Sequence, residues 1–106
     1  MATPLNLTAD LGADGRPRLT ASGEIDLSNI DAFTDALETA SAGTRGSITV
    51  DLSAVKYLDS AGISALFEHA DQVDDLHLIV HPLLIRVLRI SGLTKIANVE
   101  AGPPNT

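Results

Sequence analysis

The chain has 106 residues, no cysteine, and 14 acidic against 7 basic side chains, which gives a formal net charge of −7. A single domain of this length can bury a core, and with aromatic residues at 3% that core must be aliphatic. The lack of thiols excludes disulfides, thiolate metal sites and cysteine nucleophiles, and the few scattered cations argue against binding to nucleic acid or anionic membranes.

Neither a secretory leader nor a membrane span is expected. The N-terminus has no basic region followed by an apolar run, and no apolar segment approaches the ~20 residues that cross a bilayer. The histidines at positions 69, 77 and 81 lack the close spacing of a metal site. We therefore expect a cytoplasmic protein that uses no cofactor.

The N-terminal part of the sequence predicts a β-hairpin. Residues 5–9 alternate weakly between apolar and polar, the turn cluster 12–15 follows, and residues 18–21 resume an extended pattern. The second strand is expected to enter a loop at Asp26. Because the two strands are joined so closely, an antiparallel pair is the simplest arrangement.

An amphipathic helix is expected next, over about residues 29–41. Ser28 is its predicted N-cap, with Asp31 as the capping-box partner three positions later. Gly43 suits the left-handed position that often follows a helix. The apolar side chains that recur at spacings of three and four are Ile30, Phe33, Leu37 and Ala40.

The central segment predicts a strand, a helix and a further strand. Residues 47–52 have a strand pattern, and helical periodicity runs from about Ser60 to Gln72. Residues 76–80 are apolar almost without interruption. Such a run is typical of a parallel strand that is buried on both faces.

The C-terminal part predicts a helix opened by His81-Pro82, since proline is favoured in a first helical turn. Ser91-Gly92 is expected to end it. Residues 96–99 read as a short last strand, and residues 102–106 as a flexible tail. The predicted buried stripe of the helix consists of Leu84, Val87 and Leu88.

The predicted elements follow in the order strand-strand-helix-strand-helix-strand-helix-strand. Strand-helix-strand repeats imply right-handed crossovers and a largely parallel sheet, here with an antiparallel first strand. We therefore expect one α/β domain over residues 1–101. It would have a mixed, mostly parallel sheet that begins with a hairpin and carries amphipathic helices packed on it.

Three carboxylates, Asp26, Asp51 and Asp59, stand near predicted strand ends. Clustered at one rim of the sheet, they could bind Mg²⁺ or act as acid and base. Capping and loop solvation explain them more simply. The sequence has no glycine-rich nucleotide motif and no nucleophile elbow, so an enzyme is not expected.

Asp59-Ser60 stands where the second predicted helix begins. A serine there presents its hydroxyl to free backbone N–H groups at the positive end of a helix, a place that suits a phosphate. A plain N-cap is the alternative interpretation. Phosphorylation would add about −1.5 to −2 charges. Unit charges ~6 Å apart at an effective dielectric of ~20 repel by about 3 kcal/mol, which is roughly a hundredfold in a partner's affinity.

Residues 50–63, Val-Asp-Leu-Ser-Ala-Val-Lys-Tyr-Leu-Asp-Ser-Ala-Gly-Ile, resemble the signature of the STAS domain family, named for sulfate transporters and anti-sigma factor antagonists. Residues 22–26, Ser-Gly-Glu-Ile-Asp, resemble a second motif of the family. Residues 87–93 resemble a third, at the end of its last long helix. Together with the element order, the resemblance covers nearly the whole chain and implies a STAS-like fold.

In the bacterial antagonist branch of this family, a partner that is both anti-sigma factor and kinase phosphorylates the serine after the motif aspartate. The resemblance therefore implies a non-enzymatic switch that binds its partner until Ser60 is phosphorylated, with Ala61 leaving no competing hydroxyl beside it. The implied partners are this anti-sigma factor with serine kinase activity and a phosphatase. An accessory subunit of a membrane transport or signalling assembly is the alternative.

The same resemblance defines the expected site. Gly62 has two interpretations, since it could relax the first helical turn or let a partner backbone approach Ser60 closely. The expected surroundings of the phosphorylated side chain are Asp26, Asp59, Ala61 and Gly62. The predicted partner-binding residues are Glu24, Ser28, Ile63 and Ser64.

Overall fold

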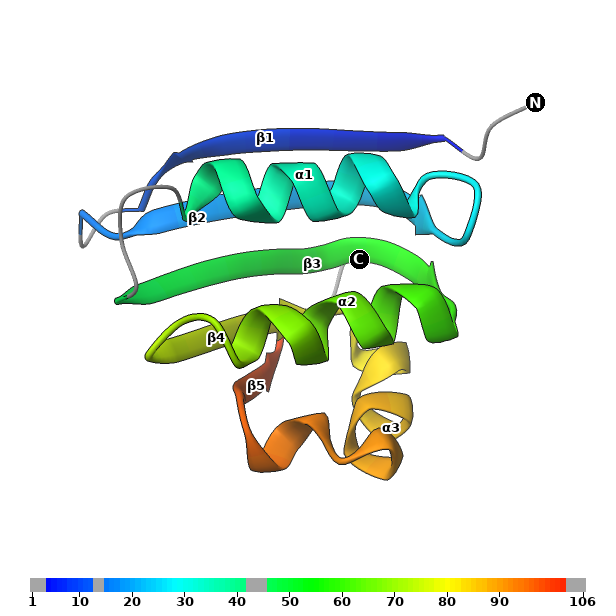
Figure 1. The fold of residues 1–106 in the computed structure, drawn as a ribbon. Coiled ribbons are helices and arrows are strands. Elements are labelled where there is room, and N and C mark those ends of the chain that lie inside the picture. Colours follow the sequence, from blue (N-terminus) through cyan, green and yellow to red (C-terminus); the bar gives the residue numbers. More distant parts are fainter. Residues whose placement is uncertain (1–3, 13–14, 42–45, 103–106) are drawn as a thin grey trace.

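The computed structural model describes residues 4–12, 15–41 and 46–102. The predicted succession of strands and helices is confirmed (Figure 1). In chain order the elements are β1 (Leu5–Leu11), β2 (Pro17–Ile25), α1 (Ile30–Ala40), β3 (Ser47–Leu58), α2 (Ser60–Ala70), β4 (Asp75–Val80), α3 (Pro82–Ser91), the 3₁₀ turn η1 (Leu93–Lys95) and β5 (Asn98–Ala101).

The strands form one sheet in the order β1-β2-β3-β4-β5. β1 and β2 pair antiparallel, and every other neighbouring pair is parallel. The predicted fold class, a mostly parallel α/β sheet with an N-terminal hairpin, is therefore confirmed. Residues 13 and 14 of the predicted turn lie outside the described residues, while the Gly12 N–H donates to the Arg16 carbonyl at 2.8 Å beside them.

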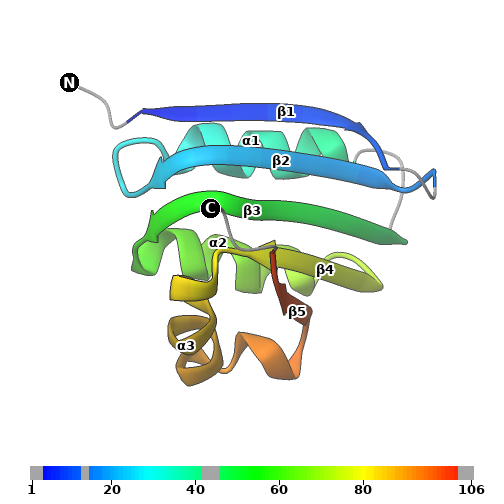
Figure 2. The ribbon, with the colours of Figure 1, turned by 180° about the vertical axis from the view of Figure 1, so that it is seen from behind.

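The helices α1 and α2 cover one face of the sheet (Figure 1), whereas the view from behind shows the strands in front of both helices (Figure 2). The core fills the space between this helix pair and the sheet. On β4, Leu78 and Val80 face this core and are buried, while His77 and Ile79 are only half-buried. The prediction that this strand is buried on both faces is therefore wrong, because none of the described helices lies over its second face.

β3 continues to Leu58 instead of ending at Leu52. Its pairing with β2 shifts register twice, between Thr20 and Ser22 and between Gly23 and Glu24, and at each shift β3 contributes one extra residue. Such bulges break the alternation of inward and outward side chains. The buried residues of this half of the strand are spaced by three, and they are Leu52, Val55 and Leu58.

The predicted capping box of α1 is wrong. Asn29 is the N-cap, no side chain caps the helix, and the Ser28 hydroxyl donates to Asp26 instead. The apolar stripe is confirmed, since Phe33 and Leu37 are buried and its outer members pack against the core. The predicted role of Gly43 falls outside the described residues.

α2 ends at Ala70, two residues before the predicted Gln72. α3 begins at Pro82 as expected, and Gly92 ends it with a left-handed φ of 90°. Within α3, Leu84 and Leu88 are buried, but the expected burial of Val87 is wrong because this side chain faces away from the core.

The end of the chain differs from the prediction in its details. The turn η1 occupies residues 93–95, so the last strand forms at residues 98–101 and not at 96–99. Gly102 is buried, and its N–H donates to the Val80 carbonyl at 2.8 Å. Residues 103–106 lie outside the described residues. None of the helices that the structure describes is long and apolar enough to cross a bilayer.

Candidate functional site

The candidate site lies where β3 ends and α2 begins. Asp59 is the N-cap of α2, because its Oδ1 accepts hydrogen bonds from the N–H groups of Ala61 at 3.0 Å and Gly62 at 3.1 Å. Ser60 is therefore the first residue inside the helix. Its interpretation as a plain N-cap is wrong, since the preceding aspartate already fills that role.

The Ser60 side chain is exposed, and its hydroxyl makes no hydrogen bond with any residue that the structure describes. It projects at the positive end of a helix that is eleven residues long. The amides of Ala61 and Gly62 are already bound to the Asp59 carboxylate. A phosphate on Ser60 would thus meet a carboxylate that competes for the same donors.

Asp59 also joins α2 to the loop between β2 and α1. Its Oδ2 accepts a hydrogen bond from the Leu27 N–H at 3.1 Å, and its own N–H donates to the Ile25 carbonyl at 3.1 Å. Asp26 lies between these two contact points in the chain. The loop that carries Asp26 is consequently held against the start of α2.

This loop is organised by its own polar side chains. Asp26 Oδ1 accepts from the Ser28 N–H at 2.9 Å and from the Ser28 hydroxyl at 2.6 Å. The buried Asn29 accepts from the Asp26 N–H at 3.0 Å and donates to the Glu24 carbonyl at 2.9 Å. Sequence reasoning missed Asn29, although asparagine directly before a helical pattern is a recognised turn and cap signal.

Gly62 is buried against the core. A Cβ built on Gly62 would lie 2.4 Å from Leu58 Cδ1 and 3.0 Å from Ile25 Cγ2. An added Cβ would therefore force the Leu58 side chain to shift, because the first turn of α2 packs closely on the ends of β3 and β2. This close packing is a third reason for a glycine here, beside the two interpretations considered from the sequence.

The residues predicted to bind a partner differ in their exposure. Glu24 and Ser64 are exposed, whereas Ile63 is half-buried and packs against the core. Ser28 is exposed, but its hydroxyl is engaged by Asp26. Each of these residues nevertheless belongs to β2, to the following loop or to the first turns of α2.

Two exposed apolar side chains flank the same elements. Leu27 is 76% exposed in the β2–α1 loop, and Tyr57 is 49% exposed near the end of β3. Tyr57 lies opposite Glu24 in the strand register. Sequence reasoning missed both, and for Tyr57 no local signal was available because the bulged part of β3 did not read as a strand.

The carboxylates Asp26, Asp51 and Asp59 do not form one cluster. Asp51 lies within β3, in register with Thr20 and Ile79, and its Oδ1 accepts from the Ser53 hydroxyl at 2.6 Å. Asp59 follows the end of that strand, at the start of α2. In the described ranges, no group of three or more histidine, aspartate and glutamate side chains is arranged to hold a metal ion.

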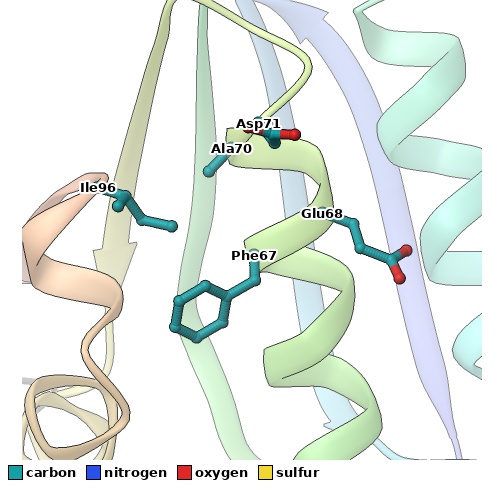
Figure 3. A pocket seen from close by; sticks show the side chains of 5 residues that line it. All are labelled: Phe67, Glu68, Ala70, Asp71 and Ile96. Atoms are coloured by element: carbon teal, nitrogen blue, oxygen red, sulfur yellow. The ribbon is translucent and has the colours of Figure 1, made fainter.

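A hollow of about 410 Å³ lies at the opposite end of α2 from Ser60. In Figure 3, Phe67 and Ile96 point toward the space between α2 and the segment before β5, and Glu68 points away from it. This hollow is thus separate from the candidate site. Its described lining consists of Phe67, Glu68, Ala70, Asp71 and Ile96.

Residues 9–99 match the model of a protein family described as Mlab, STAS domain. The chain belongs to the STAS domain family. The matched residues include every element from β2 to η1 in full, and parts of the outer strands β1 and β5. The resemblance recognised in the sequence motifs is therefore confirmed, and this STAS domain carries Asp59-Ser60 at the junction of β3 and α2.

Solved structures of anti-sigma factor antagonists share the fold. One from Mycobacterium paratuberculosis is 24% identical, with 93% of this chain and 89% of that chain covered and a TM-score of 0.81. SpoIIAA in its unphosphorylated form is 16% identical, with 90% and 88% covered and a TM-score of 0.67.

An antagonist STAS domain from Rhodobacter sphaeroides is 19% identical, with 73% of this chain and 85% of that chain covered and a TM-score of 0.53. At such identities the likeness concerns the fold. Among proteins of curated function, none matches this sequence.

Proposed function

We propose that this STAS domain is a cytoplasmic anti-sigma factor antagonist, a switch that performs no catalysis itself. It binds an anti-sigma factor with serine kinase activity while Ser60 is unphosphorylated, and releases it once Ser60 carries a phosphate. Sigma-factor-dependent transcription is regulated as a result, and a phosphatase resets the switch. The observation that carries the proposal is the exposed Ser60 hydroxyl at the first position of α2, which has no hydrogen-bond partner among the described residues.

The unphosphorylated surface suits a protein partner. Around Ser60 it offers a second hydroxyl at Ser64 on the same helix and exposed apolar area at Leu27 and Tyr57. Aromatic residues are enriched in protein interfaces. The structurally similar antagonists support the class of partner, because they share the fold over most of both chains.

Phosphorylation changes this surface by charge. Transfer of the γ-phosphoryl group of ATP to Ser60 Oγ releases ADP and a proton and adds about −1.5 to −2 charges. The Asp59 carboxylate already engages the amides of Ala61 and Gly62. The new charge is therefore poorly neutralised within the domain, and a partner shaped for a neutral hydroxyl is repelled.

The assignment of Ser60 is tested with the cognate anti-sigma kinase, ATP and intact-mass spectrometry. The wild-type chain is expected to gain one phosphate and Ser60→Ala none. Thr39→Ala, which removes an exposed hydroxyl at the far end of α1, is the matched control and is expected to behave as wild type. Equal phosphate uptake by wild type and Ser60→Ala would reject the assignment.

The second candidate is an accessory subunit of a membrane transport or signalling assembly. The observation that favours it is the description of the matching family model, which names Mlab and not an antagonist. In that role the same surface would bind its partner with Ser60 unmodified. Affinity purification that recovers a transporter ATPase with unphosphorylated Ser60, and no anti-sigma kinase, would select this role.

A further inference from the structure

The outer side of α3 carries large apolar side chains that the fold does not use. Leu83 is 69% exposed, Val87 43% and Ile90 76%. Spacings of four and three residues place these side chains on one face of a helix. Leu84 and Leu88 lie on another face and are buried in the core. Figures 1 and 2 show α3 at the border of the molecule, beyond β4.

Arginines border this exposed stripe. Arg86 follows Leu83 by three positions and precedes Ile90 by four, so it lies beside them, and Arg89 comes next around the helix. Neither guanidinium forms a hydrogen bond or ion pair with any residue in the described ranges. By contrast, Arg18 is paired with Asp10 at 3.0 Å.

We propose that this face of α3, formed by Leu83, Arg86, Val87 and Ile90 with Arg89 at its border, docks an acidic amphipathic helix of a partner protein. Contiguous exposed apolar patches on monomers are often interaction sites. Carboxylates on the partner would pair with the two guanidinium groups, which bind carboxylates in a bidentate geometry. The apolar stripe of the partner helix would cover the three uncovered side chains.

Charge favours an acidic helix over two other possible occupants of this face, an anionic membrane and a second copy of the chain. An anionic membrane is disfavoured because this face supplies only two arginines, whereas binding to anionic lipids draws on clusters of about four or more cations. A symmetric contact with a second copy would bring the same patch from both subunits together. Arg86 and Arg89 of one copy would then approach those of the other, and like charges would oppose the contact.

The test measures binding of labelled helical peptides to the purified full chain by fluorescence anisotropy. The panel presents leucines at helical spacing flanked by glutamates, and a matched panel has lysines in place of the glutamates. Acidic peptides are expected to bind, and lysine peptides are not. Ile90→Ser and the double variant Arg86→Glu/Arg89→Glu are each expected to weaken binding about tenfold or more.

The double variant should in addition gain affinity for the lysine peptides, which a merely structural effect would not produce. Asp35→Ser, an exposed change on α1, is the matched control and is expected to leave binding unchanged. Circular dichroism checks that each variant is folded. Ser60→Asp is expected to retain peptide binding, so failure of the Ser60 switch and failure of α3 docking are distinguishable.

Four results would overturn the proposal. Absence of binding by every acidic peptide, or equal binding of the acidic and lysine panels, would remove its basis. Co-sedimentation with phosphatidylglycerol vesicles that depends on Ile90 would assign the face to membranes. Dimerisation in analytical ultracentrifugation that is lost in Ile90→Ser would assign it to a second copy.

Discussion

Asp59 holds the candidate site together through both of its carboxylate oxygens. One oxygen caps α2 through Ala61 and Gly62, and the other binds the Leu27 N–H across the junction with β2. Asp59, the residue directly before Ser60, is thus a structural anchor. The negative charge of Asp59 would repel a phosphate on Ser60.

Substitution of Asp59 by alanine is expected to lower the free energy of unfolding by about 1–3 kcal/mol, since it removes an N-cap and leaves the Leu27 amide without its acceptor. Urea denaturation monitored by circular dichroism measures this loss. The exposed Asp35→Ala on α1 is the control, with an expected change below about 0.5 kcal/mol. Equal stability of Asp59→Ala and wild type would show that the anchor contributes little.

Gly62→Ala is expected to destabilise the fold by about 1–3 kcal/mol through overpacking, although alanine favours a helix by about 1 kcal/mol over glycine. The reason is the approach of the added Cβ to Leu58 Cδ1 at 2.4 Å. In a Leu58→Ala background the cost of Gly62→Ala should shrink, because the clashing atom is gone. A stabilised Gly62→Ala variant would mean that the first turn of α2 relaxes freely.

At the scale of elements, α1 and α2 meet around His69. This side chain is 4% exposed, and its Nε2 has no hydrogen-bond partner in the part of the chain that the structure describes. A hollow of about 30 Å³ beside it is lined by Glu38 of α1 and Glu68 of α2. Burial lowers the pKa of His69 from its ordinary value of 6.5, and the charge of Glu38 opposes this only in part.

The stability of the fold, to which this helix pair contributes, is therefore expected to fall in acid. Because burial lowers the His69 pKa in the folded chain, the unfolded chain binds more protons just below pH 6.5, and stability falls as the pH falls through that window. Urea denaturation between pH 7.5 and 5.5 should show that the free energy of unfolding decreases as the pH falls. This decrease should be smaller in His69→Leu than in the wild type. Thr39→Ala, an exposed and non-titrating change on α1, should keep the wild-type slope.

Helices and strands also differ in how well the sequence predicts them. The helices were found from their apolar spacing, since a helical period depends on near neighbours. The second half of β3 was missed because its bulges space Leu52, Val55 and Leu58 by three. The bulges are defined by the pairing of β3 with β2, so no pattern within residues 53–58 predicts them.

For the molecule as a whole, the proposed switch requires no refolding. The β2–α1 loop is tied internally by Asp26, Ser28 and Asn29, and Asp59 holds it to α2. A charge added at Ser60 should thus alter a surface that is already rigid. The helices are therefore expected to stay packed on one face of the sheet when a partner binds.

Ser60→Glu is accordingly expected to weaken binding of the anti-sigma partner about tenfold or more, while Ser60→Ala is not. Calorimetric titration measures the affinities, and amide chemical shifts report the structure. The shift changes in Ser60→Glu should be confined to the β2–α1 loop and the start of α2. Thr39→Glu, at the far end of α1, is the charge-matched control and should bind as wild type. Unchanged affinity of Ser60→Glu would count against a switch based on charge.

The sequence by itself determined the α/β fold class, the order of the elements and the family motif that contains Ser60. These features follow from local periodicity, turn residues and short motifs, which neighbouring residues carry. Only the tertiary structure decided that Asp59 caps α2 and binds Leu27, that Gly62 packs on Leu58, and that Val87 faces outward. Each of these depends on contacts between elements, and such contacts exist only once the sheet and helices have packed together.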